Sequence, residues 1–158
     1  MATKKSQILE EIRQRKPLPS RSAEALLGLM KTADLVNRRF ASVVEPAGIS
    51  GQQYNVLRIL RGSGKDGLPT LEVASRLIEQ TPGITRLLDR LEAKKWIRRE
   101  RCPSDRRQVL CWITPAGLEL LASLEQTVLD FDREMLGQLS AADLRDLIRI
   151  LDRIRKPA

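Results

Sequence analysis

Residues 81–114 decide the fold; they read TPGITRLLDRLEAKKWIRRERCPSDRRQVLCWIT. The first part, through Lys94, has the apolar spacing of an amphipathic helix. We expect Thr81 to be its N-cap and Pro82 its first helical residue, because proline is tolerated at that position. The inward face of this helix would carry Ile84, Leu87, Leu88 and Leu91. The opposite face would offer Thr85, Arg86, Asp89 and Arg90 to solvent.

Another short helix is expected immediately before, from an N-cap at Thr70 to about Ile78. Its buried residues would be Leu71, Ala74 and Leu77. Two short helices joined by a tight turn are typical of a helix-turn-helix, whose second helix enters the major groove of DNA. We therefore place a helix-turn-helix at about residues 70–94.

The hydrophobic period changes from helical to alternating after these helices. Residues 96–102 and 108–114 are rich in β-forming residues and flank the polar turn Pro103–Arg107. This pattern predicts a β-hairpin with a basic tip over about residues 96–114. A hairpin that directly follows a recognition helix is a wing, and its arginines could reach the minor groove of DNA.

Long helices are expected toward both ends of the chain. Residues 21–45 carry a one-sided apolar stripe, and residues 115–156 carry two more. The helices that carry these two stripes would start at Thr114 and Ser140. After the first of these helices, Ser50–Gln53 predicts a capping box at the start of a further helix. The apolar stripes at the two ends have little to pack on within one winged unit, so we expect a homodimer. The predicted fold is mainly α with a small β-hairpin wing: a winged helix-turn-helix plus N- and C-terminal dimerisation helices.

Length and composition exclude several classes of protein. The chain has 158 residues, a formal charge of +8 and no histidine, which removes the commonest general base and metal ligand. Two cysteines are too few for a structural zinc site, so we expect no enzyme, no metal and no cofactor. We find no apolar run of a secretory signal or a membrane span, and we expect a cytoplasmic protein that does not contact membranes.

The positive charge is concentrated in two segments. Residues 86–107 have a net charge of +5, residues 1–39 also have +5, and residues 108–140 have −4. A charge run is usually a solvated face, but clustered Lys and Arg also form phosphate-binding surfaces. We treat residues 1–20 as a basic N-terminal arm and residues 21–156 as the folded domain.

The two cysteines leave two interpretations. In a hairpin centred near Asp105, Cys111 would pair with Arg99 while Cys102 would face Gln108, so the two thiols would be too far apart for a strain-free disulfide. They are either small apolar filling residues or a thiol sensor that distorts the wing when it is oxidised.

The order of these elements resembles that of the MarR family of bacterial transcriptional regulators. The most specific motif is Asp105-x-Arg107, followed after five residues by Ile113-Thr114-x-x-Gly117, which is similar to the family's wing signature. The segment Thr85–Glu92 also resembles the family's recognition helix. Two departures stand out. The family commonly has glycine where Lys95 stands, so this chain either forces Lys95 toward a positive φ or turns differently. It also lacks the first-helix cysteine of the peroxide-sensing branch.

The resemblance implies roles for particular residues. The DNA contacts would come from the recognition helix and the wing tip: Thr81, Pro82, Gly83, Thr85, Arg86, Arg90, Arg106 and Arg107. Asp105 and Arg98 would orient the wing, with Asp105 holding Arg107 or a strand arginine in position. A small aromatic effector would bind near Phe40, Tyr54 and Leu57, although these residues also fit an ordinary core.

The function that the resemblance implies is a sequence-specific regulator of double-stranded DNA, a repressor that a small ligand releases. It would bind a pseudo-palindromic operator as a homodimer, with recognition helices about 10 bp apart. The alternatives are a thiol-based redox regulator of the same fold and a winged-helix protein-interaction module that does not bind DNA.

Overall fold

The computed structural model describes residues 7–156, and the chain divides into two units, residues 1–41 and 42–158. Unit 1 contains α1 (Gln7–Glu11) and most of α2 (Arg21–Val44). Ser20 starts α2, because its Oγ accepts a hydrogen bond from the Ala23 amide at 3.1 Å. The predicted basic arm therefore includes a short helix, and its residues 1–6 lie outside the described part of the chain.

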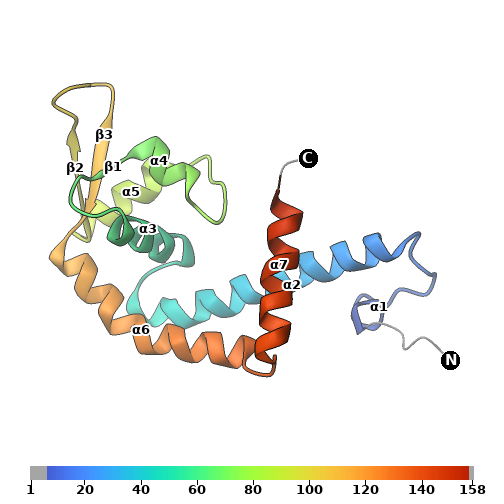
Figure 1. The fold of residues 1–158 in the computed structure, drawn as a ribbon. Coiled ribbons are helices and arrows are strands. Elements are labelled where there is room, and N and C mark those ends of the chain that lie inside the picture. The colour runs from blue at the N-terminus through green and yellow to red at the C-terminus, as the bar shows by residue number, and fades with distance from the viewer. Residues whose placement is uncertain (1–6, 157–158) are drawn as a thin grey trace. The chain divides into compact units, whose positions relative to one another are not determined.

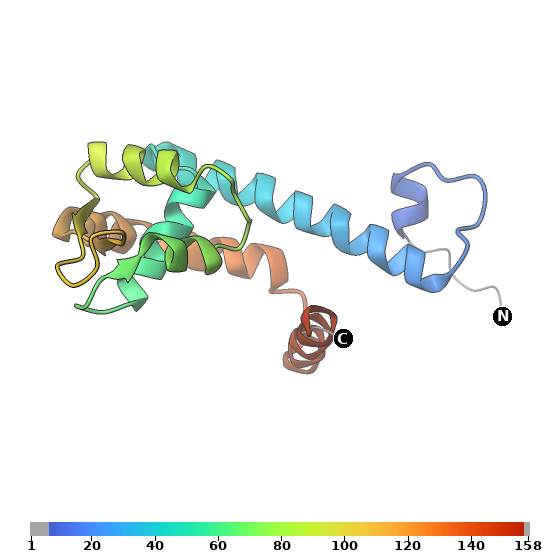
Figure 2. The ribbon, with the colours of Figure 1, turned by 90° about the horizontal axis from the view of Figure 1, so that it is seen from above.

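Unit 2 holds the helix-turn-helix and the wing. Its elements in chain order are η1 (Glu45–Ala47), α3 (Gly51–Gly62), β1 (Leu68–Pro69), α4 (Thr70–Ser75), α5 (Ile84–Ala93), β2 (Ile97–Arg101), β3 (Val109–Ile113), α6 (Pro115–Leu136) and α7 (Ala141–Arg155). The hairpin of β2 and β3 and the last helix lie at opposite ends of α6 (Figures 1 and 2). This is the mainly helical fold with a small wing that the sequence predicts.

Side-chain caps start α3, α6 and α7 where the sequence places them. Ser50 and Gln53 form the predicted capping box of α3, with hydrogen bonds of 3.2 and 3.0 Å. Thr114 caps α6 by accepting a hydrogen bond from the Gly117 amide at 3.2 Å. Ser140 caps α7 in a second capping box, with Asp143 as its partner. These boundaries depend on neighbours in the sequence, which is why the sequence alone identifies them.

The wing is part of a three-stranded antiparallel sheet in the order β1-β3-β2. Arg99 pairs with Cys111, and the Cys102 amide donates to the Gln108 carbonyl oxygen at 2.9 Å, so the predicted hairpin register is confirmed. The sequence did not indicate β1, which is only two residues long and pairs Leu68 with Cys111. A two-residue strand has no alternation to detect.

The core of unit 2 lies where α3, the helix-turn-helix and the sheet meet. Its most deeply buried large side chains are Leu57, Leu60, Leu88, Leu91, Ile97, Leu121, Val44, Val56, Val73 and Cys111. Leu87, Leu88 and Leu91 of α5 are buried as predicted, and Ile84 is half-buried. Burial of this leucine face fixes which side of α5 remains exposed.

The first helix of the helix-turn-helix differs from its prediction. It ends at Ser75 rather than at about Ile78, and Leu71, which was expected inside, is 81% exposed while Val73 is buried. Thr70 does not cap it; its hydroxyl donates to the Val109 carbonyl oxygen at 3.2 Å instead. Pairing of the preceding residues with β3 rotates the helix so that Val73 faces the core.

The turn of the helix-turn-helix is held by a buried side chain of α3. Asn55 is 7% exposed, and its Oδ1 accepts a hydrogen bond from the Ile78 amide at 3.0 Å. Close by in the sequence, Gln52 donates to the carboxylate of Glu79 at 3.3 Å. A buried amide that satisfies a backbone N–H in the turn fixes the path of the chain between α4 and α5.

Candidate nucleic-acid interface

The recognition helix α5 exposes the face that the sequence predicts. Thr85, Arg86, Asp89 and Arg90 are all exposed. Among the residues that the structure describes, neither Arg86 nor Arg90 forms an ion pair. Their guanidinium groups are therefore available to a partner outside the chain.

The start of α5 differs from its prediction. The helix begins at Ile84 with Gly83 as its N-cap, so Thr81 and Pro82 lie in the preceding turn rather than at the cap and first helical position. The Thr81 hydroxyl accepts a hydrogen bond from the Gly83 amide at 3.3 Å, which stabilises this turn. Pro82 is exposed, and the first amides of α5 have no side-chain cap. An uncapped helix start can donate hydrogen bonds to phosphate or base edges.

The end of α5 is a Schellman turn with a lysine in the left-handed position. Lys95 has φ 61°, its amide donates to the Glu92 carbonyl oxygen at 2.8 Å, and the Trp96 amide donates to that of Leu91 at 3.1 Å. Thr114, which directly follows β3, stabilises this turn: its hydroxyl donates to the Lys95 carbonyl oxygen at 2.7 Å. The sequence left open whether Lys95 adopts a positive φ, and the structure shows that it does.

Lys94 attaches the end of the recognition helix to the loop before α3. Its Nζ donates to the Gly48 carbonyl oxygen at 2.5 Å and lies 4.6 Å from the centroid of the Trp96 ring. Both contacts use the positive charge of Lys94 within the protein. From the sequence alone, Lys94 is only one of the cations of the net-positive segment 86–107.

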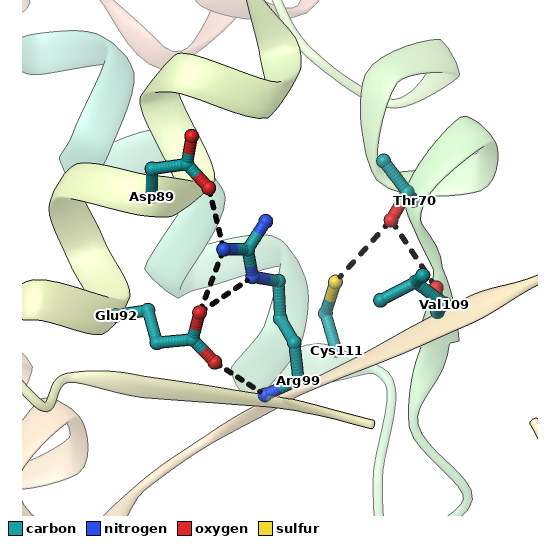
Figure 3. Close-up of polar contacts among 6 residues, drawn as sticks. All are labelled: Thr70, Asp89, Glu92, Arg99, Val109 and Cys111. Atoms are coloured by element: carbon teal, nitrogen blue, oxygen red, sulfur yellow. Dashed lines mark hydrogen bonds and ion pairs between the residues drawn. The ribbon is translucent and has the colours of Figure 1, made fainter. Parts of the chain in front are cut away.

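Arg99 of β2 connects the wing to the recognition helix (Figure 3). Its Nη2 lies 2.5 Å from Asp89 and 2.6 Å from Glu92, its Nε donates to Glu92 at 3.0 Å, and its backbone amide donates to the other Glu92 oxygen at 3.0 Å. Burial opposes the charge of Arg99, but hydrogen bonds with Glu92 and Asp89 outweigh it and raise the pKa of the guanidinium. Sequence reasoning missed this network, because it joins residues of two different elements.

The wing tip presents exposed arginines on an ordered turn. The Arg107 side chain is 92% exposed, and its Nε and Nη2 donate to Asp105 at 3.1 and 3.4 Å. Hydrogen bonds from the Arg107 side chain and backbone lower the pKa of Asp105. Arg106 is exposed beside them. Asp105 thus orients Arg107 while leaving most of the guanidinium surface open.

Arg98 is held by the strands rather than by Asp105. It pairs with Glu100 and lies 4.1 Å from the centroid of the Trp112 ring, which is its partner across the sheet. On another side, Trp112 donates from Nε1 to the Lys65 carbonyl oxygen at 3.0 Å. Gly67 has φ 74° and lies so close to the Trp112 ring that a Cβ there would collide with it. Trp112 therefore docks the loop before β1 onto the wing.

The three candidate pocket residues do not form one site in either unit. Phe40 belongs to unit 1, where it is half-buried, while Tyr54 and Leu57 lie on α3 of unit 2. Tyr54 is half-buried, but Leu57 has no exposed surface. Leu57 is therefore a core residue here, which was the alternative interpretation of its position.

The two cysteines are free thiols in different environments. Burial raises the pKa of Cys111, whereas a hydrogen bond with Ser104 lowers the pKa of Cys102. Cys102 faces Gln108, three residues along β3 from Cys111, which corresponds to about 10 Å along the strand. A disulfide within one chain does not fit this register.

Acidic and thiol side chains offer no metal site in the described part of the chain. No group of three or more Cys, Asp or Glu side chains there is arranged to hold an ion. No helix within residues 7–156 has the length and apolar character needed to cross a membrane.

Comparisons with known proteins place this geometry among regulators. The model of the MarR family matches residues 49–109, which include α3, the helix-turn-helix, β2 and the turn of the wing. The multiple antibiotic resistance protein MarR of Salmonella typhimurium is 30% identical over 119 residues, which are 75% of this chain and 81% of that protein.

Two solved structures show the same fold. A MarR transcription factor from Planctomyces limnophilus is 38% identical, with a TM-score of 0.67 over 86% of this chain and 98% of that one. A variant of the E. coli protein MarR, solved in complex with operator DNA, is 24% identical, with a TM-score of 0.79 over 89% of this chain and 100% of that one.

Proposed function

The chain belongs to the MarR family of DNA-binding transcriptional regulators, and we propose that it is a repressor that binds a pseudo-palindromic operator as a homodimer and is released by a small ligand. The relatives are regulators, so the prediction that the chain is not an enzyme is confirmed. A winged-helix module without DNA binding is thereby disfavoured.

The observation that carries the proposal is the set of exposed cations on α5 and at the wing tip. Arg86 and Arg90 project from the exposed face of α5, and Arg107 projects from the turn of the wing. A helix and a hairpin tip of this kind fit the major groove and the adjacent minor groove. In this proposal Arg86 contacts guanine edges and Arg107 enters the minor groove.

The remaining site residues take supporting roles in the same proposal. Thr81, Pro82 and Gly83 bring the uncapped start of α5 to a phosphate, and Thr85 contacts a thymine methyl group. Arg90 and Arg106 contact the phosphate backbone. Arg98 stiffens the wing through Trp112 rather than touching DNA.

A homodimer is supported by apolar side chains that one chain leaves exposed. These lie on the first long helix and on the last helix of the chain: Leu26 (57% exposed), Met30 (61%), Ile148 (60%) and Ile154 (59%). Exposed apolar residues on a helix, such as Leu26 and Met30 four positions apart, are typical of surfaces that another helix covers. We propose that a second copy of the chain covers them, and light scattering that shows a monomer at micromolar concentration would contradict this.

The experiment that tests the function is selection of duplexes from a random pool, followed by binding at several salt concentrations. We expect two half-sites about 10 bp apart and a steep loss of affinity as salt rises. Arg107→Ala should lower the slope of log K against log salt by about 0.9, because a cation in the minor groove also displaces condensed counterions and this is the value for one phosphate charge neutralised. Arg133→Ala is the matched control, because Arg133 is also exposed and pairs with a nearby aspartate, Asp130, but lies on α6.

Outcomes of this experiment are unambiguous. If the wild-type chain selects no duplex, the DNA-binding role fails for this protein. If Arg107→Ala and Arg133→Ala change the slope equally, the wing-tip role of Arg107 fails. Release by a ligand is tested by adding small phenols and aromatic carboxylic acids to the bound duplex. Retention of the duplex with every compound would contradict that part of the proposal.

A further inference from the structure

The recognition helix carries two negative charges close to the face proposed to meet DNA. Asp89 lies three residues after Arg86 and next to Arg90, and its side chain is 54% exposed. Glu92 lies three residues further and is 38% exposed. Residues three or four apart share one face of a helix, so both carboxylates lie near cations that would approach phosphates. Uncompensated carboxylates at this position would repel the DNA backbone.

Arg99 supplies the compensating charge from the wing. Its side chain is only 18% exposed, and two of its nitrogens donate to the two carboxylates of the recognition helix (Figure 3). The guanidinium is thus directed at α5 rather than at solvent. The backbone amide of Arg99 also donates to Glu92, so the strand and the helix are joined both through the side chain and through the main chain.

We propose that Arg99 is a positioning residue for DNA binding: it acts as the internal counterion of the recognition helix, partly neutralising Asp89 and Glu92 without touching DNA. With Arg99 in place, the cluster of two carboxylates and one guanidinium has a net charge of −1. Without Arg99 its net charge is −2, directly beside the proposed groove contacts. This inference rests on the proposed DNA contacts of α5.

The test is a double-mutant cycle measured in DNA affinity rather than in stability alone. Arg99→Gln is made in the wild-type chain and in the Asp89→Asn/Glu92→Gln chain, and each protein is titrated with the selected duplex. We expect Arg99→Gln to weaken binding by about tenfold in the wild-type background and by less than about threefold when the carboxylates are gone. If Arg99 contacted phosphate directly, the loss would be equal in both backgrounds, and the proposal would be wrong.

Salt dependence separates the charge effect from a merely structural one. Repulsion between exposed carboxylates and phosphates is screened by salt, so the penalty of Arg99→Gln should shrink as salt rises. A loss caused by a distorted helix would not shrink in this way, and a salt-independent penalty would overturn the proposal. Arg99→Lys keeps the charge but loses the forked geometry of the guanidinium, so it should weaken binding less than Arg99→Gln does.

A matched control uses a neighbouring arginine of the same strand. Arg98→Gln removes the same charge from β2, but Arg98 pairs with Glu100 and contacts neither carboxylate of α5. The loss of DNA affinity caused by Arg98→Gln should therefore be the same in both backgrounds. If this loss disappeared in the Asp89→Asn/Glu92→Gln chain, the coupling would not be specific to Arg99. Circular dichroism and urea unfolding of every variant check that it folds.

The failure of this inference can be told apart from that of the proposed function. If the wild-type chain binds no duplex, the DNA-binding role is wrong and the inference falls with it. If the wild-type chain binds but the cycle shows no coupling between Arg99 and the two carboxylates, only the counterion role is wrong.

Discussion

Lys95 provides the sharpest test of the backbone geometry, since it occupies a position that suits glycine. Its φ of 61° lies in the left-handed region, where the Cβ of an L-residue crowds the backbone. The surrounding hydrogen bonds of the Schellman turn and the Thr114 hydroxyl hold it there. We expect Lys95→Gly to relieve this strain and raise the free energy of unfolding.

The magnitude follows from two opposing contributions. An L-residue in the left-handed conformation costs about 1–2 kcal/mol, which glycine does not incur. Glycine has greater freedom in the unfolded chain, which costs about 0.4–1 kcal/mol on folding. The side chain of Lys95 is exposed and contributes no hydrogen bond in the described structure, so its loss adds little. The expected net stabilisation is about 0.5–1 kcal/mol, or a rise in Tm of about 2 °C.

The assay is urea unfolding at one fixed protein concentration, because the proposed dimer would make stability concentration-dependent. Lys95→Ala is the reference, since it removes the same charge but keeps a Cβ. Neighbouring Lys94 has φ −83°, an ordinary right-handed value, and it supplies the matched control. There the change from alanine to glycine should destabilise the protein by about 0.5–1 kcal/mol.

The prediction is therefore a reversal of sign between two adjacent positions. At Lys95 glycine should be more stable than alanine, and at Lys94 it should be less stable. If glycine is less stable than alanine at both positions, the left-handed turn at the end of the recognition helix is not the conformation in solution.

Two further predictions concern packing and thiol chemistry. Gly117→Ala should destabilise the protein by about 1–3 kcal/mol in urea unfolding, because a Cβ there would collide with the Trp96 carbonyl oxygen; unchanged stability would show that the start of α6 is loosely packed. With limiting iodoacetamide, mass spectrometry should find Cys102 labelled before Cys111, since a hydrogen bond lowers the pKa of Cys102 while burial raises that of Cys111. As the pH is lowered, labelling of Cys102 should persist after labelling of Cys111 has stopped. Equal labelling rates at every pH would contradict the lowered pKa of Cys102 and the raised pKa of Cys111.

The features that could be predicted from the sequence are those that depend on near neighbours. The capping boxes at Ser50 and Ser140 need only a residue three positions away, and the hairpin register follows from the position of the turn near Asp105. The exposed face of α5 follows from the spacing of its leucines. Local chemistry and hydrophobic period were sufficient for these elements.

The features that could not be predicted depend on contacts between distant segments. The inward face of α4 is set by pairing of the preceding strand with β3 and by the bond from Thr70 to the Val109 carbonyl oxygen, across 39 positions of the chain. Propensity and period carry no information on such a contact. The ion pairs of Arg99 could not be predicted for the same reason. The only local signal is that Asp89 and Glu92, three residues apart, lie on one face of a helix that a cation could face.

The two tryptophans give this protein an intrinsic optical probe of its wing. The chain contains only Trp96 and Trp112, and each indole lies against a cation, Lys94 in one case and Arg98 in the other. Indole emission therefore arises entirely at the base of the wing, where β2 begins and β3 ends, and the long terminal helices contribute none. Unlabelled protein can thus report movement of the wing during a titration, while unfolding of the terminal helices remains silent until it reaches the sheet.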